Sequence, residues 1–270
     1  MNKLLTSFLY LLLSIRLVAA APAQVQVVHA GQTRAFAIES EISGGYYSTA
    51  HLAHDASTGE RAVVKLFRPH HSAQGMLDTY AKEVEVLSSI KGRHAKLFPK
   101  VFGAGHSIEG VPAAAMAMEH IDAPHVLGRG PWPAQRAVRI VRRVLDGLTD
   151  LHAAGWLHRD LRERNILVAE SGRSNTTRVV DLGEAIRIDG KHTSLTDVKG
   201  AAELLLGLVS GMRPDGASNI VWQPAALEIA RGIHALDGST DLGTVISNAL
   251  DGHYATAAEL RAALQPFTKR

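Results

Sequence analysis

Hydrophobic and polar positions follow two different patterns along this 270-residue chain. Three short runs rich in apolar residues, residues 35–42, 49–54 and 62–67, predict three β-strands. In two longer segments, residues 73–90 and 133–154, apolar residues recur every three or four positions, which predicts amphipathic helices. The pattern therefore predicts a chain that mixes strands with helices.

Short apolar runs between and after these segments predict further strands. They lie at residues 99–102, 113–118, 166–168 and 178–180. A stretch rich in glycine and proline, residues 128–133, precedes the second long helix, and such residues commonly mark the start of a helix. We therefore expect a boundary within the chain at this stretch.

The most informative stretch lies between the helix at residues 133–154 and the strand at 166–168. It contains Asp160 and Asn165, and the strand at 178–180 leads directly into Asp181. Phosphoryl transfer from ATP requires one carboxylate near the attacking hydroxyl, and an amide oxygen and a second carboxylate that hold magnesium on the phosphates. These three residues are therefore candidates for that chemistry.

The same stretch resembles two motifs of the protein kinase family. The residues from His158 to Asn165 match the catalytic-loop pattern H-R-D-L-x-x-x-N, and Asp181-Leu182-Gly183 matches the metal-binding turn D-F-G with leucine in second place. The resemblance is to a compact, bacterial-type serine/threonine kinase.

The family resemblance implies an α+β fold with two lobes. A small β-rich N-lobe is expected at residues 34–119, a hinge and linker at 120–130, and a mainly helical C-lobe at 131–266. A helix that begins near Asp197 is similar to the central helix of the C-lobe, and a helical pattern at residues 255–264 is similar to the last one.

The resemblance also implies roles for single residues in the C-lobe. Asp160 corresponds to the catalytic base, and Asn165 and Asp181 correspond to ligands of the magnesium ions that accompany ATP. Arg162 stands where a lysine is usual in serine/threonine kinases, and it keeps a cation near the transferred phosphate. Because some tyrosine kinases carry an arginine there, the acceptor hydroxyl stays open between serine or threonine and tyrosine.

Two charged residues of the expected N-lobe complete this catalytic set. Lys65 lies in an apolar strand, where a buried ammonium group would be costly without an anionic partner. Glu83, on the helix predicted at residues 73–90, is the expected partner, by similarity to the lysine–glutamate pair of the family. Taken singly, a solvent-exposed charge is the simpler interpretation of either residue.

The remaining nucleotide-binding positions carry a weaker signal. The glycine-rich hairpin of the family corresponds here to Ser43, Gly45 and Ser48, so only the middle glycine is kept. Taken alone, this segment is more typical of an ordinary small-residue hairpin. Glu119 and Ile121 match the hinge that offers backbone groups to adenine, with Met118 at the position of the gatekeeper.

The segment after Gly183 departs from the family. Only residues 184–196 separate the metal-binding turn from the next helix, and the A-P-E motif is missing. Tyr254 stands where the family places an arginine that pairs with the glutamate of that motif. We therefore expect a truncated activation segment and an enzyme that is active without phosphorylation of it, with the Arg159 side chain held by an internal group or by a partner.

Composition and charge exclude several classes of function. The chain has no cysteine, which excludes disulfides, zinc–thiolate sites and thiol catalysis. Its formal charge is +3 without a lysine run, so no nucleic-acid partner is expected. The arginines Arg136, Arg139, Arg142 and Arg143 follow one side of a helix, which predicts either a surface for an acidic partner or simply a solvated face.

The first 23 residues have the layout of a secretory signal or leader: a basic start, an apolar segment and a run of small residues. Arg16 interrupts the apolar segment, so no stable membrane span is expected. A cleaved signal predicts a secreted or host-delivered protein, whose substrate would then be a host protein. An uncleaved leader predicts a cytoplasmic one.

Three functions remain on the sequence alone. The favoured one is a protein kinase that uses ATP and Mg2+ to phosphorylate serine or threonine hydroxyls of proteins. The short segment after Gly183 also fits a small-molecule phosphotransferase of the same fold. The degraded glycine loop fits a non-catalytic nucleotide-binding protein, a pseudokinase. The substrate and the oligomeric state cannot be deduced from the sequence.

Overall fold

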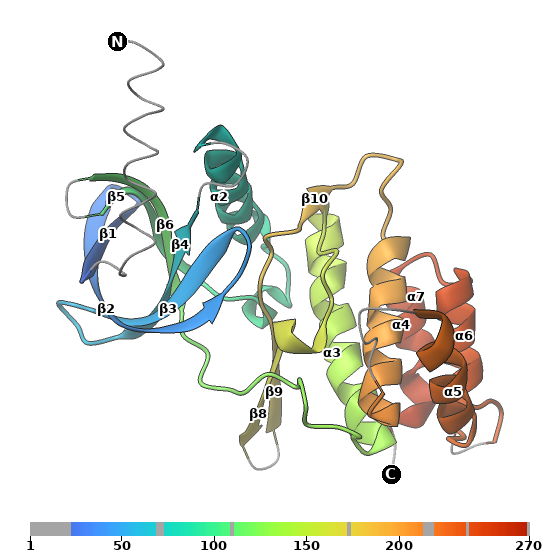
Figure 1. Cartoon of the computed structure of the whole chain (residues 1–270). Coiled ribbons are helices and arrows are strands. Elements are labelled where there is room, and N and C mark those ends of the chain that lie inside the picture. Colours follow the sequence, from blue (N-terminus) through green and yellow to red (C-terminus); the bar gives the residue numbers. More distant parts are fainter. Residues whose placement is uncertain are drawn as a thin grey trace. The chain divides into compact units, whose positions relative to one another are not determined.

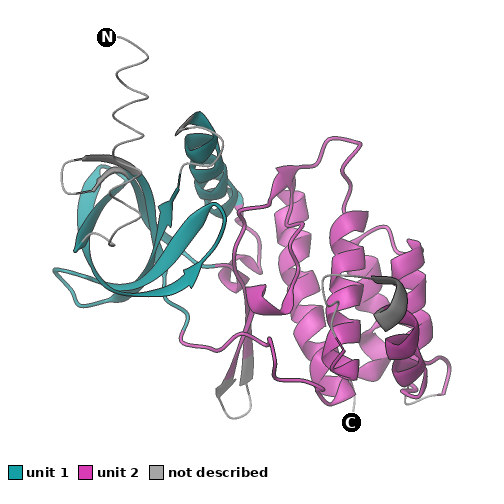
Figure 2. Cartoon of the chain, in the orientation of Figure 1, with its two compact units in different colours: residues 1–89, 99–121 teal, residues 90–98, 122–270 magenta. Residues whose placement is uncertain are grey.

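The computed structural model describes residues 23–68, 73–108, 111–171, 174–212, 219–235 and 238–268. The leader expected at the start of the chain lies outside these residues, apart from Ala23. In the described part of the chain, no helix combines the length and the apolar character needed to cross a membrane. The residues form two units, unit 1 from residues 1–89 and 99–121 and unit 2 from residues 90–98 and 122–270 (Figure 2).

Unit 1 is built on a β-barrel (Figure 1). Its strands pair antiparallel and close in the order β1-β2-β3-β4-β6-β5. Their bounds are β1 Gln24–His29, β2 Gln32–Gly44, β3 Ser48–Asp55, β4 Arg61–Phe67, β5 Val101–Ile108 and β6 Val111–Glu119. The helix of this unit, α2, is Ala73–Ser89, close to the predicted 73–90.

Strand β1 is the element of unit 1 that the sequence pattern did not predict. It pairs with both β2 and β5 and so closes the barrel. Its approach to β5 depends on two glycines, because a Cβ at Gly103 would lie 2.7 Å from the Val27 side chain and one at Gly105 would lie 2.3 Å from the Gln26 carbonyl oxygen. Any larger residue there would push the two strands apart.

The apolar residues of unit 1 form two clusters, one on each face of the sheet. Alternate residues of β4 explain the division, since successive side chains of a strand point to opposite faces. Val64 and Leu66 belong to one cluster, with Val25, Val27 and Phe36. Phe67 belongs to the second, with residues of α2 and with Met116 and Met118 of β6. Lys65 therefore shares the sheet face that α2 covers.

Unit 2 is mainly helical (Figure 1). The helix α3 packs against α4 and α7, while α5 and α6 also pack against α4. The bounds are α3 Ala134–Ala153, α4 Leu195–Ser210, α5 Asn219–Arg231, α6 Leu242–Asp251 and α7 Ala257–Ala263. The sequence pattern predicted α3 and the family resemblance implied α4 and α7, whereas α5 and α6 were not anticipated.

Short strands and 3-10 turns of unit 2 carry the residues of the candidate site. The strand β7, Trp156–Leu157, pairs with β10, Ile186–Arg187. The hairpin of β8, Ile166–Ser171, and β9, Ser174–Val179, follows the turn η2, Glu163–Asn165. Two further turns are η1, Ala95–Leu97, and η3, Gln265–Phe267.

Candidate active site

The Lys65–Glu83 pair is formed within unit 1, as the sequence predicted. The Lys65 ammonium nitrogen lies 2.8 Å from each carboxylate oxygen of Glu83. Both side chains are buried, with 11% of Lys65 and 2% of Glu83 exposed. Removing one partner of such a pair costs about 3–5 kcal/mol, because the other is left as a buried, uncompensated charge. The pair thus fixes the position of the lysine ammonium group.

The hairpin that corresponds to the glycine-rich loop joins β2 and β3. Ser43 and Gly45 are exposed there, and the Gly45 N–H donates to the Ser48 carbonyl oxygen at 2.8 Å. Tyr46, at the tip, is 65% exposed and stacks edge-on with Tyr47. A Cβ at Gly45 would meet only the Ser48 oxygen at 3.5 Å, an ordinary contact, so this backbone conformation does not itself require glycine.

The two hinge residues lie at the end of unit 1. The Glu119 N–H donates to the Lys100 carbonyl oxygen at 2.8 Å, and the Glu119 carboxylate accepts from the Lys100 N–H at 3.2 Å. Within the described residues, Ile121 makes no backbone hydrogen bond. Its N–H and C=O therefore remain available to a ligand, whereas the N–H of Glu119 is already used by the sheet.

In unit 2, the loop that follows β7 is held by a carboxylate from α4. Asp197 is buried, and its oxygens accept from the backbone N–H of His158 at 2.7 Å and of Arg159 at 2.8 Å, while the His152 ring nitrogen lies 2.9 Å away. Arg159 adopts a positive φ of 67°, which costs energy for a side chain of this kind. The bonds to Asp197 stabilise this strained turn.

The electrostatics of this loop follow from its burial. Burial alone would raise the pKa of Asp197, but the hydrogen bond from His152 and the backbone N–H donors outweigh it, so the pKa is lowered. Burial lowers the pKa of His158, although the negative charges of Asp197, Asp181 and Asp160 oppose it. Sequence reasoning placed Asp197 only on a helix; a lone acid at the start of an apolar helix was the available signal.

The Asp160 carboxylate is nearly buried and surrounded by donors. The Asn165 amide nitrogen lies 2.9 Å from one carboxylate oxygen and 2.8 Å from the Asp160 carbonyl oxygen. Arg162 pairs with the other carboxylate oxygen, and Arg164 approaches at 3.3 Å. The side chains of both arginines are more than half exposed. Arg164 was not predicted to belong to the site, because no family motif specifies it.

Asp181 follows the strand pair that carries Asn165. The Val180 N–H donates to the Asn165 carbonyl oxygen at 2.9 Å, which brings Asp181 beside Asn165. Asp181 has a φ of 66°, a left-handed conformation that aspartate tolerates better than most residues. Its carboxylate is exposed, and the next residue, Leu182, is fully buried and anchors the turn in the core.

The oxygens of Asn165 and Asp181 fit a magnesium ion. The Asn165 amide nitrogen is bonded to Asp160, which turns the amide oxygen away from that carboxylate and leaves it as an acceptor. Amide and carboxylate oxygens are the hard ligands that magnesium binds, and it commonly takes only one or two carboxylates plus phosphate oxygens. No cluster of three or more His, Asp or Glu residues suited to a metal occurs among the described residues, so the protein alone supplies few ligands.

The short segment after Gly183 is folded by its own contacts. Asp189 accepts from the backbone N–H groups of Lys191 and His192, and Ser194 donates to the Ala255 carbonyl oxygen at 2.7 Å. The Arg159 side chain is exposed and has no partner among the described residues. No internal group of the described chain therefore holds this arginine, one of the alternatives expected from the sequence.

Comparison with known proteins identifies relatives of the chain. Serine/threonine-protein kinase pkn2 of Myxococcus xanthus is 25% identical over 186 residues, which cover 67% of this chain and 21% of the relative. Serine/threonine-protein kinase AfsK of Streptomyces coelicolor is 26% identical over 226 residues, 81% of this chain and 24% of the relative. PknL of Mycobacterium tuberculosis, also a serine/threonine-protein kinase, is 30% identical over 137 residues, 42% of this chain and 34% of the relative.

The chain spans less than half the length of these relatives. The protein kinase domain family matches residues 36–204, which run from β2 through most of α4 and include every candidate catalytic residue described above. The motifs around Asp160 and Asp181, the Lys65–Glu83 pair and this match agree, and the chain belongs to the protein kinase family.

Proposed function

We propose that the chain transfers the γ-phosphate of ATP to serine or threonine hydroxyls of proteins. The observation that carries the proposal is the Asp160 carboxylate, which is fixed by the Asn165 amide nitrogen, while the Asn165 backbone carbonyl binds the N–H of Val180 next to Asp181. A fixed carboxylate can orient a hydroxyl and accept its proton. The names of the relatives support serine or threonine as the acceptor.

The residues of each unit have separate tasks in this proposal. Lys65, fixed by Glu83, binds phosphate oxygens of the nucleotide, and the backbone of Ser43 and Gly45 covers them. The backbone groups of Glu119 and Ile121 bind the adenine edge. Asn165 and Asp181 hold magnesium, which neutralises charge on the phosphates when it is bound.

Arg162 and Arg164 point to the kind of acceptor. Their exposed guanidinium groups flank the Asp160 carboxylate, so acidic groups beside the acceptor hydroxyl would be attracted and basic groups repelled. We propose that acidic residues next to the serine or threonine favour phosphorylation. Matched peptides that carry either glutamate or lysine beside one serine test this, and Arg164→Glu should reverse the order of their rates.

The direct test of the function is transfer of labelled phosphate from ATP to a mixed library of serine, threonine and tyrosine peptides. We expect Asp160→Asn to lower the rate by about 100-fold to 10,000-fold, because a general base typically contributes that much. Binding of MgADP should change little. Asp251→Asn, the same chemical change on an exposed carboxylate of α6, is the matched control and should keep full activity.

One observation favours a second function, a small-molecule phosphotransferase. The segment at residues 184–196 is short and lacks the motif that positions a peptide in the family. A metabolite extract assayed beside the peptide library separates the two functions. Transfer to a metabolite alone would replace the proposed protein substrate, and equal transfer by wild type and Asp160→Asn would exclude both functions.

A further inference from the structure

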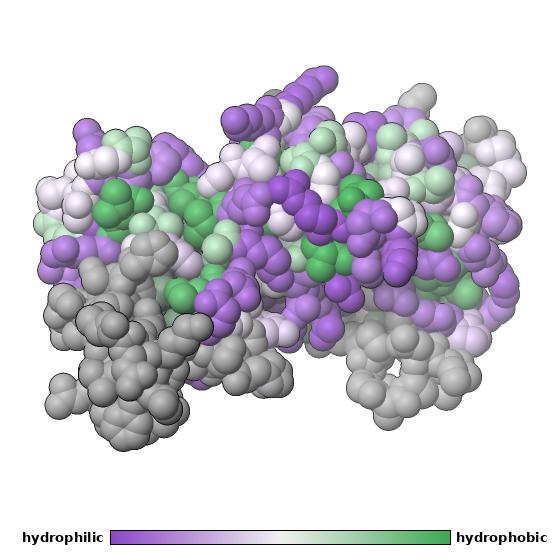
Figure 3. Space-filling model, turned by 90° about the horizontal axis from the view of Figure 1, so that it is seen from above, coloured by the Kyte–Doolittle hydropathy of each residue, from purple (hydrophilic) through white to green (hydrophobic). Residues whose placement is uncertain are grey.

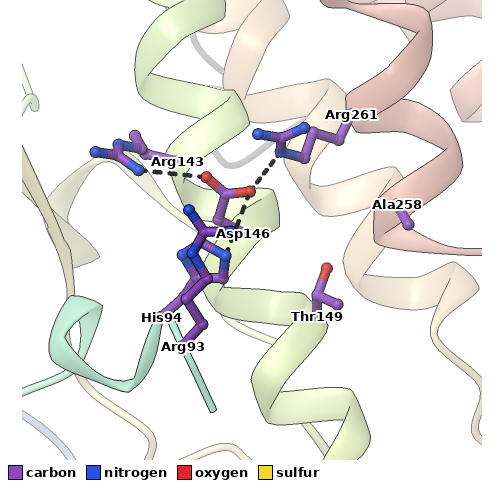
Figure 4. Close-up of a pocket in the computed structure, with 7 residues that line it drawn as sticks. All are labelled: Arg93, His94, Arg143, Asp146, Thr149, Ala258 and Arg261. Atoms are coloured by element: carbon purple, nitrogen blue, oxygen red, sulfur yellow. Dashed lines mark hydrogen bonds and ion pairs between the residues drawn. The ribbon is translucent and has the colours of Figure 1, made fainter.

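A polar pocket of about 340 Å³ lies in unit 2, outside the candidate active site (Figure 4). Three segments far apart in the sequence line it: the loop before η1, the middle of α3 and the start of α7. The lining residues are Arg93, His94, Arg143, Asp146, Thr149, Ala258 and Arg261. Among them, charged side chains predominate.

A contact with Asp150 of α3 holds the loop before η1 at the pocket. The His94 backbone N–H donates to the Asp150 carboxylate, and that carboxylate approaches the backbone of Gly92 so closely that a Cβ there would lie only 2.1 Å from it. Only glycine allows this approach. The contact places the next two residues, Arg93 and His94, at the pocket.

Asp146 holds the cations of the pocket together. Only 7% of its side chain is exposed, and it pairs with Arg261 of α7 and with Arg143 at 3.5 Å on its own helix. The His94 ring nitrogen lies 4.0 Å from the same carboxylate. Figure 4 shows these groups converging on Asp146 from three sides. Asp146 thereby fixes the directions in which the guanidinium groups point.

Positive charge exceeds negative charge at this site. Three arginines face the single carboxylate of Asp146, which can neutralise only one of them. Arg93 has no ion-pair partner within the described part of the chain. Arg142 lies close enough to be affected by these charges: burial lowers its pKa, the charge of Arg261 lowers it further, and Asp146 opposes both.

A purely structural ion-pair cluster would explain the contacts of Asp146 but not the hollow beside them. The side chains of Arg143 and Arg261 remain 54% and 40% exposed, so their outer N–H groups are open to a ligand. Small residues, Thr149 and Ala258, line the same space and leave it unfilled. The site therefore combines excess positive charge with room for a ligand group.

On the face seen in Figure 3, hydrophobic residues form separate patches among hydrophilic ones. This face therefore offers no apolar docking site stronger than the Asp146 pocket. Arginine binds phosphate well, because its planar fork can donate two hydrogen bonds to phosphate oxygens. We propose that the Asp146 pocket binds the phosphate group of a phosphorylated serine or threonine segment. This rests on the proposed function, since such segments are the product of that reaction.

The binding test does not need catalysis. The full chain with Asp160→Asn is titrated with acetyl-Ala-Ala-phosphoserine-Ala-Ala-amide, and heat or chemical-shift changes report binding. We expect the phosphorylated peptide to bind at least tenfold more tightly than the same peptide with serine. Raising the salt concentration should weaken the binding, as charge pairing at an exposed site requires. A kinase with no detectable transfer activity could still pass this test.

Three variants assign the binding to this pocket. Arg93→Gln removes the unpaired cation, and Ala258→Phe fills the pocket at an exposed position without a change of charge; each should weaken binding about tenfold or more. Arg139→Gln removes an exposed arginine of α3 outside the pocket and should have no effect. Transfer to short unphosphorylated peptides should be unchanged in the three variants when Asp160 is present.

Several outcomes would overturn the proposal. Equal affinity in Ala258→Phe and Arg93→Gln would place the binding elsewhere, and equal affinity of inorganic phosphate would exclude a phosphorylated protein segment as the ligand. A further titration, with protein that has been allowed to phosphorylate itself, identifies the source of the segment. If this chain excludes the probe until phosphatase treatment, the segment is its own; if it binds the probe unchanged, the segment belongs to another protein.

Discussion

Two buried carboxylates, one in each unit, are stabilised in different ways. In unit 1, Glu83 is paired with a cation, the ammonium group of Lys65. In unit 2, Asp197 accepts from two backbone N–H groups and lies beside the His152 ring, so most of its support comes from neutral donors. The first arrangement positions a side chain, and the second positions a stretch of backbone.

The difference determines which substitution each arrangement tolerates. An ion pair loses its stabilising effect when either charge is removed, because the remaining charge is buried alone. Backbone donors remain after every substitution except one to proline, so the Asp197 arrangement depends mainly on the carboxylate. We therefore expect the unit 2 loop to be sensitive at Asp197 and the unit 1 pair to be sensitive at both positions.

Asp197→Ala should have the largest effect. It leaves two backbone N–H groups near the loop without an acceptor, at roughly 1–3 kcal/mol for each or about 2–6 kcal/mol for the two, and it also removes the contact to His152. Urea unfolding measures the loss, and the phosphoryl transfer rate should fall with it. Asp197→Asn keeps one acceptor oxygen and should cost less. A loss below about 1 kcal/mol in Asp197→Ala would show that the loop holds itself.

Lys65→Met should cost about 3 kcal/mol of unfolding free energy at neutral pH, because the buried Glu83 carboxylate loses the ammonium group that lies 2.8 Å from both of its oxygens. The double variant Lys65→Met, Glu83→Leu removes both charges and should recover most of the stability. If the double variant were as unstable as the single one, packing rather than charge would explain the loss.

Each unit also buries a histidine, and both should make stability depend on pH. Burial lowers the pKa of His158 in unit 2 and of His51 in unit 1 below the ordinary 6.5. The unfolded chain then binds more protons than the folded chain below pH 6.5, so the free energy of unfolding should fall as the pH drops. The fall should be at most about 1.4 kcal/mol per pH unit for each histidine.

Unfolding of wild type, His51→Asn and His158→Asn from pH 7 to pH 5 measures these contributions. The slope of unfolding free energy against pH reports how many more protons the unfolded chain binds, and each variant should reduce this number by up to one. Asp197 should not interfere in this range, because its lowered pKa means that its contribution is complete above pH 3.8 and is lost only as the pH falls through the lower folded value. An unchanged slope in both variants would contradict the assignment.

The smallest effect is expected in the segment after Gly183. Its folded contacts need no phosphate, so the triple variant Thr193→Ala, Ser194→Ala, Thr196→Ala should keep its transfer rate within about twofold of phosphatase-treated wild type. A tenfold drop, equivalent to about 1.4 kcal/mol in the barrier, would show that phosphorylation of this segment controls the enzyme.

The sequence predicted those features that depend on local pattern or on a known motif. The helices α2 and α3 followed from period, and the Lys65–Glu83 pair from the family resemblance. Strand β1 was missed although Val25 and Val27 alternate with polar residues, because the neighbouring leader dominated the interpretation. Its pairing with β5 involves residues far away in the sequence, which no local pattern records.

Contacts between distant residues account for the other omissions. Asp197 reaches the loop at His158 from α4, and the Asp146 pocket collects residues from three segments. Of the helical arginines expected on one shared face, Arg143 lines that pocket, whereas Arg136 lies over the Trp132 ring at 4.3 Å. Their separate partners depend on tertiary packing. Neither of the two predictions, a surface for an acidic partner or a solvated face, therefore describes both arginines.

The closed barrel of unit 1 has a consequence for aggregation. An open sheet presents unpaired backbone groups along its edges, and such edges can recruit strands from other molecules. Strand β1 occupies the place between β2 and β5 where two edges would otherwise lie. Loss of residues 24–29 would expose both edges and turn the closed sheet into a template for intermolecular pairing.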